Sequence, residues 1–580
     1  MILLRCIASG LVICAIAAGI RGPAASAQEP QGTSPSAISA QTTVVHGMVR
    51  NGASGAPLPR ALVRINGDAA TAALTDGDGR FEIADVPEGP QEFTIIKPGY
   101  LDEIEARADS AAWNAHGYGH NVIVAPEMGD VVFTMQPVNS IIGQIQLSTG
   151  DAADGIQVML LRRTVQDGRG TWQVASTART NSEGGYRFDE LADGLYAVNT
   201  EPAMDNDGAT GLVENGSAKN VEREGYAMTF FPDARNLTGA AKISLAGGEQ
   251  AQANLTLTLE PFHTVTATVT LPGNRYSNEI SAQVLDPQGH QLPYAAQYDA
   301  ATHTLQTMLP DGNYSLMAEV MLNRPMQIIE DGERVDFSAR SPAPIAGQVS
   351  LAVAGHGVSN LLIPLSAVGN SSVQVTVAHG SDSAVQNTDP RLYIGLTAAG
   401  DWISGNINYG FAEGQLSSLS HIEHPPAGSY WVHTSIAPSV LCEASFTAAG
   451  ASLGREPLVI NDSRSASGPL VLALRDDCAK LTLTLPGSIG MSAGIERYFT
   501  VYVVPDFDST VDLVPQTLRL STGGRATLNG LTPGNYHVYS FDHPVALEYR
   551  NPAVLQGLPS QAVTLSPNAE AQLAIEVAQP

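Results

Sequence analysis

One short pattern recurs along this chain and limits what the chain can fold into. Each copy has a polar turn with glycine, an alternating strand, and a second turn whose glycine precedes a strand opened by an aromatic residue. Alternation with period two places every second side chain on one face, and glycine supplies the positive φ angles of tight turns. The pattern therefore predicts paired antiparallel strands. The aromatic residues of its five copies are Phe93, Tyr196, Tyr314, Tyr430 and Tyr536.

These five aromatic residues are separated by 103, 118, 116 and 106 residues. Such a period exceeds the roughly 20 to 50 residues of solenoid and propeller repeats and suits one globular domain per copy. The composition agrees, since 43% of the residues are hydrophobic and the 56 Gly and 36 Pro residues exceed the usual share. We predict an all-β protein, built as a tandem array of about five antiparallel β-sandwich modules.

Alternating strands end each unit shortly before the next unit begins, so we expect short linkers. The predicted organisation is a signal peptide at 1–27, a flexible segment at 28–42, and modules at 43–137, 138–260, 261–368, 369–476 and 477–580.

In four copies the turn glycine is followed, two residues later, by tyrosine. A tyrosine here can fill the core with its ring while its hydroxyl reaches a backbone acceptor, as in the tyrosine corner of sandwiches. Recurrence at one structural position favours this packing role, and a sugar-binding tyrosine is the alternative. The pairs are Gly194 and Tyr196, Gly312 and Tyr314, Gly428 and Tyr430, and Gly534 and Tyr536.

The first residues have the pattern of an export signal. Arg5 precedes an apolar run over 6–20, and Ala25-Ser26-Ala27 provides small residues of the A-x-A kind, which predicts cleavage between Ala27 and Gln28. The run is too short for a membrane anchor, and no later segment predicts a transmembrane helix. We expect a secreted, periplasmic or cell-surface protein.

Cleavage at that point would leave Cys442 and Cys478 as the two thiols of the mature chain. An even pair of cysteines in an oxidising compartment predicts a disulfide.

A second signature precedes the first motif: V-x-G-x-V from Val45, then Gly55-Ala56-Pro57-Leu58-Pro59. With the Thr75–Phe81 turn and strand, it resembles the carboxypeptidase regulatory-like domain, a transthyretin-like sandwich. Residues 43–100 resemble it well, and 138–200 and 477–580 fairly. The chain as a whole resembles secreted acidobacterial proteins that carry such domains in tandem. The resemblance implies immunoglobulin- or transthyretin-like sandwiches, and it makes carbohydrate a permissible ligand without implying an activity.

Charge excludes one class of partner. The chain has 57 acidic residues against 30 basic ones, of which only Lys97, Lys219, Lys242 and Lys480 are lysine. No cationic surface is available to neutralise phosphates, so nucleic acid is excluded as a partner.

No catalytic residue is predicted. None of the 13 histidines has glutamate three places on, and the G-x-S-x-G match at 450–454 precedes an extended segment rather than a helix. The acidic turns that begin at Asp76 and Asp205 resemble calcium loops but lack the glutamate at the twelfth position. We predict a non-enzymatic protein with no cofactor and no metal site, although so acidic a surface leaves weak Ca²⁺ binding open.

The candidate binding residues are aromatic. Trp113, His116, Tyr118 and His120 lie together in a polar connection between strands, where binding residues tend to gather. Rings beside polar donors suit sugar stacking, and the two histidines could hold a metal ion. The alternative is a tryptophan packed against its own module. Trp402, at the top of a predicted hairpin, is a second, weaker candidate.

We therefore predict an exported binding or structural protein, such as a polysaccharide-binding or cell-surface adhesion protein. An alternative is an accessory protein that docks an envelope transport or peptidase system through exposed strand edges. A hydrolase is a remote third hypothesis. The partner, a polysaccharide or an envelope protein, is not identified by the sequence.

Overall fold

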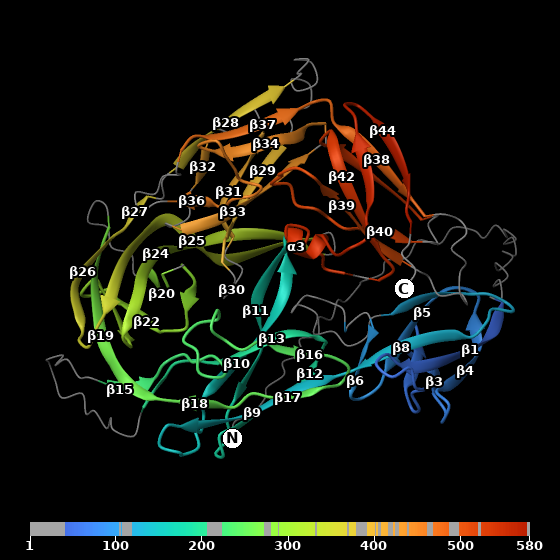
Figure 1. The fold of residues 1–580 in the computed structure, drawn as a ribbon, viewed down its shortest axis with the longest axis horizontal. Helices are drawn as coiled ribbons and strands as arrows, with labels where there is room; N and C mark the ends of the chain where they lie inside the picture. The colour runs from blue at the N-terminus through green and yellow to red at the C-terminus, as the bar shows by residue number, and fades with distance from the viewer. Residues whose placement is uncertain are drawn as a thin grey trace, which may run out of the picture. The chain divides into compact units, whose positions relative to one another are not determined.

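The computed structural model describes most of the chain after residue 40. The described residues are 41–580 except 104–105, 107–118, 206–222, 272–279, 288, 331–332, 368–369, 379–390, 401, 404–407, 416–420, 424–427, 438–439, 461–467, 486–497, 520–523, 544 and 577–580. Their secondary structure is dominated by strands that pair into small sheets (Figure 1). The fold is all-β, as predicted. Among the described residues, no helix is long and apolar enough to cross a membrane.

Two four-stranded sheets form the first module. One has the order β4 (Arg80–Pro87), β1 (Thr42–Asn51), β8 (Val131–Pro137) and β6 (Tyr100–Asp102). The other has the order β3 (Asp68–Leu74), β2 (Leu62–Ile65), β5 (Gly89–Ile96) and β7 (His120–Val124). Alternate residues are buried along β1 and β5, as period two requires. Phe93 and Phe133 come from the two sheets and meet with ring centroids 5.7 Å apart, which closes a sandwich core.

The Asp76 turn connects β3 to β4. The Asp76 carboxylate accepts hydrogen bonds from the backbone N–H groups of Asp78 (2.9 Å) and Arg80 (2.8 Å). Gly79 has φ +72°, and a Cβ there would lie 2.7 Å from the carbonyl oxygen of Val49. This turn connects a strand of one sheet to a strand of the other, rather than the two strands of a hairpin, and its aspartate accepts from the backbone of the same turn.

The second module also has two sheets. The first has the order β16 (Ile243–Leu245), β13 (Gly194–Thr200), β10 (Gln157–Gln166), β11 (Arg169–Arg179) and β30 (Trp402–Ile403). The second contains β12 (Gly185–Leu191), β9 (Asn139–Leu147), β17 (Gln250–Gln252) and β18 (Leu255–Leu257). β30 belongs to the predicted fourth module, so a sheet of the second module ends on a strand more than 200 residues away.

The third module shares its core with the second. Its first sheet contains β14 (Ala203–Met204), β15 (Arg223–Tyr226), β19 (Leu259–Thr270), β23 (Thr304–Leu309), β22 (Ala296–Asp299) and β26 (Val358–Pro364). Its second contains β21 (Gln291–Leu292), β20 (Ile280–Leu285), β24 (Gly312–Glu330), β25 (Glu333–Val353) and β27 (Ser366–Ala367). The boundary placed between 260 and 261 falls inside β19. Leu161 and Trp172 of the second module join Val265 and Leu316 in one apolar cluster, so the two modules pack through buried side chains.

Four more sheets complete the described chain. The fourth module has β28 (Asn370–Ala378), β32 (His421–Glu423), β37 (Leu470–Arg475), β34 (Cys442–Ala448) and β35 (Ala451–Ser452) against β31 (Asn408–Gln415), β29 (Arg391–Ala398), β33 (Gly428–Ala437) and β36 (Leu458–Ile460). The fifth has β41 (Arg525–Leu531), β38 (Ala479–Thr484) and β44 (Glu570–Ala574) against β40 (Gln516–Arg519), β39 (Tyr498–Pro505), β42 (Gly534–Phe541) and β43 (Gln561–Leu565). The short helix α3 (Pro552–Leu555) lies between β42 and β43 in the chain.

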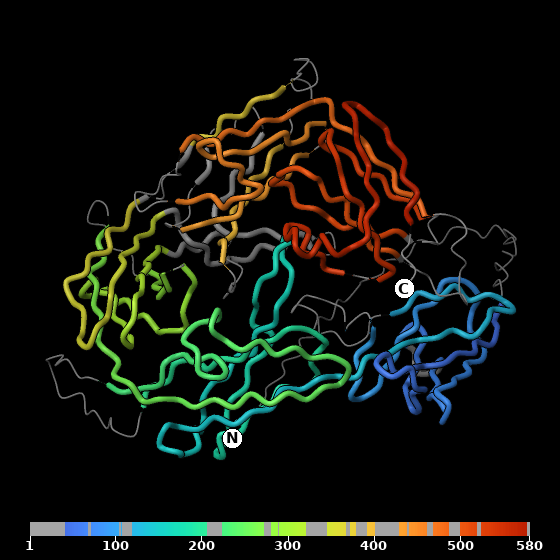
Figure 2. The backbone as a smooth tube through the Cα atoms, in the orientation of Figure 1, coloured from blue at the N-terminus to red at the C-terminus, as the bar shows by residue number. Residues whose placement is uncertain are grey.

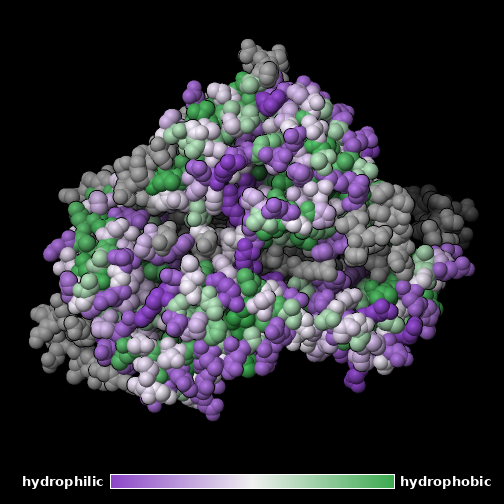
Figure 3. All heavy atoms as spheres, viewed as in Figure 1, coloured by the Kyte–Doolittle hydropathy of each residue, from purple (hydrophilic) through white to green (hydrophobic). Residues whose placement is uncertain are grey.

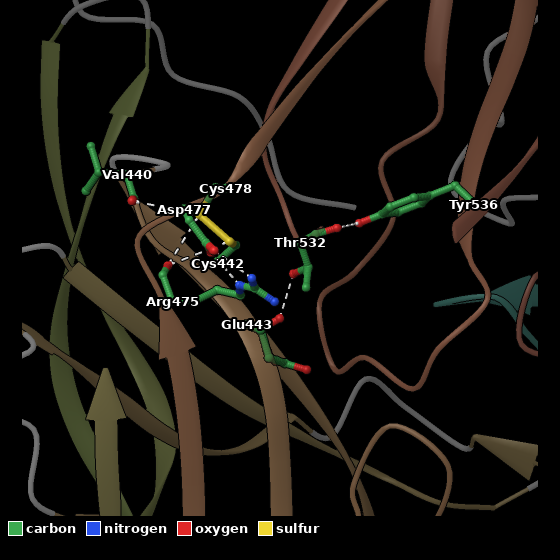
Figure 4. The surroundings of a disulfide bond; sticks show 8 residues. All are labelled: Val440, Cys442, Glu443, Arg475, Asp477, Cys478, Thr532 and Tyr536. Atoms are coloured by element: carbon green, nitrogen blue, oxygen red, sulfur yellow. Dashed lines mark hydrogen bonds and ion pairs between the residues drawn. A yellow bond between two sulfur atoms is a disulfide. The ribbon is translucent and has the colours of Figure 1, made fainter. Parts of the chain in front are cut away.

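A disulfide joins Cys442 to Cys478, which confirms the predicted pairing (Figure 4). Cys442 begins β34, and Cys478 directly precedes β38, so the bond lies where the fourth module passes into the fifth. The backbone carbonyl of Glu443 accepts a 2.6 Å hydrogen bond from the Thr532 hydroxyl. The Thr532 carbonyl in turn accepts one from the Tyr536 hydroxyl, also at 2.6 Å. The disulfide and this hydrogen-bond chain tie the two modules together.

Candidate functional site

The candidate site is built around the hairpin of β10 and β11, which Figure 2 traces in the second module. Its turn is Asp167-Gly168, with φ values of +49° and +71°. Positive φ at both central residues is the condition of a type I′ turn, for which Asp-Gly is a preferred sequence. The register from Gln157↔Arg179 to Gln166↔Arg169 keeps the two strands paired up to the turn. A long and regular hairpin with a defined tip results.

The tip contacts the segment that leads into helix α3 of the fifth module (Figure 1). The backbone N–H of Arg550 donates to the Gly168 carbonyl at 2.9 Å, and Nε of Arg550 donates to the Asp167 carbonyl at 3.1 Å. A Cβ at Gly168 would lie 2.6 Å from ring carbons of Tyr549. Glycine is therefore required at the tip both by its positive φ and by the ring against which it packs.

The guanidinium of Arg550 also fixes the neighbouring loop of the fifth module. It donates to the carbonyls of Ser509 (2.7 Å) and Val511 (3.3 Å), and it lies 3.7 Å from the Asp512 carboxylate. One arginine thus connects the hairpin tip, the segment before α3 and the 509–512 loop.

His433 brings the fourth module to the same place. It comes from β33, is 6% exposed, and lies between two carboxylates. Its Nδ1 is 2.8 Å from Asp512, and its Nε2 is 2.7 Å from the Thr397 hydroxyl and 3.7 Å from Asp167. Burial is the main reason why the pKa of Asp167 is raised, and the nearby His433 opposes that rise. Side chains of three predicted modules therefore meet at one buried imidazole.

Asp167, His433 and Asp512 could hold a metal ion, since their ligand atoms lie within 4.8 Å of one another. Each imidazole nitrogen, however, already has an oxygen within hydrogen-bond distance, on opposite sides of the ring. An ion would have to displace one of these bonds. The arrangement fits a hydrogen-bonded junction better than a preformed metal centre.

A buried ion pair lies on the other side of the hairpin. Arg163 of β10 pairs with Glu548, which is 6% exposed and also accepts from the Asn551 side chain at 3.0 Å. The hydrogen bond from Arg163 is the main cause that lowers the pKa of the Glu548 carboxyl. Arg163 and Glu548 are 385 residues apart in the chain, and they add a second charged link between the second and fifth modules.

Arg169, the first residue of β11, stacks on Trp431 of β33 with its Cζ 3.6 Å from the ring centroid. Tyr430 points the opposite way and is buried in the core of the fourth module, as alternation along a strand requires. Burial, followed by the like charge of Arg550, lowers the pKa of Arg169 to about 10. Arg169 is therefore still a cation at neutral pH.

A cleft of about 1020 Å³ lies between the second, fourth and fifth modules, and Arg163, Arg169, Trp431, Glu548 and Arg550 are among the residues that line it. Its walls mix arginines with carboxylates and aromatic rings, among them Tyr539 and Tyr549. A cleft of this size lies at the upper end of small-molecule binding sites. On the face of the molecule drawn in Figure 3, hydrophilic and hydrophobic residues are interspersed.

A second cleft, of about 840 Å³, lies between the second and third modules. Its lining includes three aromatic rings, Trp172, Tyr294 and Tyr314, and the ammonium of Lys242 lies 5.0 Å from the Trp172 centroid. Burial raises the pKa of Tyr294 to about 12, with the hydroxyl hydrogen-bonded to backbone at Met228 and to Tyr314. The rings pack edge to face and belong partly to the core.

The candidate residues chosen from the sequence lie elsewhere or outside the described residues. Trp113, His116 and Tyr118 fall outside them, as do Ala27 and Gln28 at the expected cleavage point. His120 lies at the start of β7, with Nε2 2.7 Å from the buried Asp102 carboxylate and its ring against Phe133. His120 is partly buried and packs at the edge of the first module's core, so its imidazole is not exposed for sugar stacking.

Trp402 lies in β30, which pairs in parallel with β11 through Trp172↔Trp402. The sequence analysis thus selected a strand that pairs with β11, and β11 carries Arg169 in the cleft of about 1020 Å³. Trp402 itself is not among the residues that line that cleft. Ser452 of the G-x-S-x-G match lies in β35, which pairs antiparallel with β34. A two-stranded hairpin is not the strand-to-helix turn that a nucleophile elbow needs.

All four motif tyrosines are buried. Tyr196 donates to the Ala192 carbonyl at 2.8 Å and Tyr536 to the Thr532 carbonyl at 2.6 Å, in each case four residues upstream. Burial raises the pKa of Tyr536, Tyr430 and Tyr314. The glycine two residues before each tyrosine begins the same strand. Tyr196 and Tyr536 thus have the hydrogen bond of a tyrosine corner, and Tyr430 is buried in the core of its module.

The sequence did not single out Arg169, His433, Asp512 or Arg550. Each stands in a strand or loop without a local motif, and they meet only because three modules come together. One local signal was present: an Asp-Gly turn between two long alternating strands predicts a hairpin with an ordered tip. Nothing in that signal says what the tip contacts.

Residues 44–111 match the family model of the carboxypeptidase regulatory-like domain. The first module is therefore a carboxypeptidase regulatory-like domain, as the sequence resemblance implied. No curated protein matches the chain.

Three solved structures of bacterial proteins are similar to this chain at low identity. The Bacillus anthracis TIE protein shares 10% identity over 92% of this chain and 68% of that one, with a TM-score of 0.14. A streptococcal ancillary pilin shares 11% over 56% and 99%, with a TM-score of 0.18. Two B repeat units of the Staphylococcus aureus collagen binding protein share 10% over 75% and 100%, with a TM-score of 0.13. At these scores the similarities carry no information about the function of this chain.

Proposed function

We propose that the protein is an exported, non-enzymatic binding protein whose β-sandwich modules form one scaffold for an extracellular polysaccharide. The observation that carries the proposal is the junction at the hairpin tip. There, Arg550 of the fifth module donates from its backbone N–H and its side-chain Nε to two carbonyls of the hairpin tip. The buried His433 of the fourth module lies between Asp167 of the second module and Asp512 of the fifth. Modules held in this way present their surfaces at fixed separations, as binding to a long repetitive ligand requires.

Two features favour a polysaccharide over other ligands. Both large clefts combine aromatic rings with polar side chains, the combination that binds sugar rings by stacking and their hydroxyls by hydrogen bonds. The net charge of -27 disfavours polyphosphates and nucleic acids.

The test uses the mature chain, residues 28–580, on a glycan array and in pull-downs with insoluble polysaccharides. We expect retention by at least one polysaccharide class. Trp431→Ala is expected to weaken that retention, and Trp113→Ala, in the loop chosen from the sequence, tests the alternative binding residue. Retention on no glycan would reject the proposal. A single stoichiometric protein partner after cross-linking in the native envelope, without glycan binding, would instead support an accessory docking role.

A further inference from the structure

Arg169 differs from the other arginines that line the cleft of about 1020 Å³. Arg163 pairs with Glu548, Arg455 lies 3.3 Å from Asp508, and Arg550 donates to backbone carbonyls. Among the residues that the structure describes, Arg169 has no carboxylate within ion-pair distance and no hydrogen-bond acceptor for its guanidinium. Its Cζ lies over the face of Trp431.

The Cζ atom of Arg169 lies over the face of Trp431, 3.6 Å from the ring centroid, and this contact restricts where the guanidinium can move. The five N–H donors of a guanidinium form a planar fork that matches the two oxygens of a carboxylate. Such a fork, already held in place, loses little entropy when it binds. Arg169 therefore offers a preorganised site for a planar anion.

The surroundings make this cation costly without an anion. Burial, followed by the like charge of Arg550, lowers the pKa of Arg169, and the charges of Tyr549, Asp167 and Asp512 oppose this change without reversing it. An anion placed between the N–H edge and the cleft would relieve both effects, because an opposite charge favours the cationic form. An unpaired buried charge of this kind is common at binding sites and rare elsewhere.

The charge around the cleft selects the anion. Asp506, Asp508 and Glu548 also line it, and the whole chain is strongly acidic. A doubly charged phosphate is repelled about twice as strongly as a carboxylate by the same field. A singly charged carboxylate is therefore the anion that fits.

The rest of the lining suits a sugar. The exposed Gln556 offers a neutral donor and acceptor for hydroxyl groups, and His537 and Tyr539 place two rings in the same cleft with centroids 6.4 Å apart. This combination of ring faces and neutral polar groups is typical of sites for polyhydroxylated rings.

We propose that Arg169, stacked on Trp431, binds the carboxylate of a single uronic-acid residue in an otherwise neutral polysaccharide, with the sugar ring in the cleft beside it. This proposal names the ligand class for the polysaccharide-binding function and rests on that function. Arg169 acts as a specificity-determining residue, because a neutral sugar of the same shape would leave its fork unpaired.

The test is titration calorimetry of the mature chain at pH 7 with two galactose trimers, one neutral and one with a single galacturonic acid residue in place of one galactose. We expect the wild type to bind the uronate trimer at least tenfold more tightly than the neutral trimer. Arg169→Gln should reduce uronate affinity about 10- to 100-fold, as for the loss of a charged hydrogen bond. Arg169→Lys should lose most of the affinity, because an ammonium keeps the charge but not the fork.

Arg525→Gln is the matched control, since Arg525 is exposed on β41 and does not line the cleft. It should leave both affinities unchanged. Thermal unfolding of each variant distinguishes lost binding from a lost fold. The Arg169→Lys variant retains the stacking cation if Arg169→Gln proves unstable.

The outcomes separate this proposal from the broader one. Equal binding of both trimers, unchanged in Arg169→Gln, would overturn the uronate proposal and leave polysaccharide binding standing. Uronate binding that depends on Arg169, without retention on any polysaccharide, would support the carboxylate site and reject the broader function. No binding of either trimer, together with no retention on any polysaccharide, would overturn both.

Discussion

The substitution Gly168→Ala tests whether the hairpin tip holds the three modules together. Gly168 has φ +71°, and a methyl group there would lie 2.6 Å from three carbons of the Tyr549 ring. A left-handed conformation costs an L-residue about 1 to 2 kcal/mol. Forcing a methyl group into a packed contact costs a further 1 to 3 kcal/mol or so. The second cost is specific to the junction.

Gly67→Ala is the matched control. Gly67 follows Asn66 in the β2–β3 turn with φ +70°, nearly the same backbone conformation, and a Cβ there would have no neighbour within 4 Å. Gly67→Ala therefore has the free-energy cost of the left-handed backbone conformation without a steric clash. The difference between the two variants isolates the packing against Tyr549.

The assay is hydrogen exchange at the Arg550 amide, which donates to the Gly168 carbonyl. A junction destabilised by about 1 to 3 kcal/mol should open more often and exchange roughly 5- to 150-fold faster. Gly67→Ala should leave this amide unchanged and affect only its own turn. If Gly168→Ala leaves the Arg550 amide as protected as in the wild type, the tip does not hold the modules together.

Four further predictions concern single groups. Glu548→Gln should destabilise the fifth module by about 1 to 3 kcal/mol at pH 7; because the folded-state pKa is lowered, the difference in urea unfolding should vanish as the pH falls below that pKa. Asp167→Asn should be neutral or stabilising at pH 7. Because the pKa of the Asp167 carboxyl is raised in the folded state, the protonated carboxyl stabilises the fold in acid, and this contribution is lost as the pH rises through that pKa. Thermal melts at pH 4 and pH 7 show whether the effect of the substitution changes in this direction. Replacing Cys442 and Cys478 by serine should cost about 3 to 4 kcal/mol by the loop-closure relation, measured as a lower urea midpoint that dithiothreitol does not lower further. Tyr536→Phe should cost about 0.5 to 1.5 kcal/mol for its lost hydroxyl bond, and a variant as stable as wild type would argue against the tyrosine corner.

The module interiors could be predicted because their signals are local. Alternation along β1 and β5, the Asp-Gly turns and the buried Tyr196 and Tyr536 depend on residues close together in the chain. The cysteine pair needed one further assumption, an oxidising compartment. The boundaries between modules were harder to predict, since β19 continues through the position chosen between 260 and 261.

The cleft could not be predicted, because its parts have no local pattern. Arg163 meets Glu548 from 385 residues away, and Arg169 reaches Trp431 from another module. The aromatic loop around Trp113 was the strongest local signal for binding, and it lies outside the described residues.

Sequence alone was sufficient for the β-sandwich class and the number of motif copies, and, with an oxidising compartment assumed, for the disulfide. Each follows from short-range alternation, turn chemistry, or a count of cysteines. Tertiary structure alone decided which modules touch, which arginine lacks a carboxylate, and which tryptophan faces a cleft. Contacts between modules depend on the shapes of whole folded surfaces, and no short stretch of residues records them.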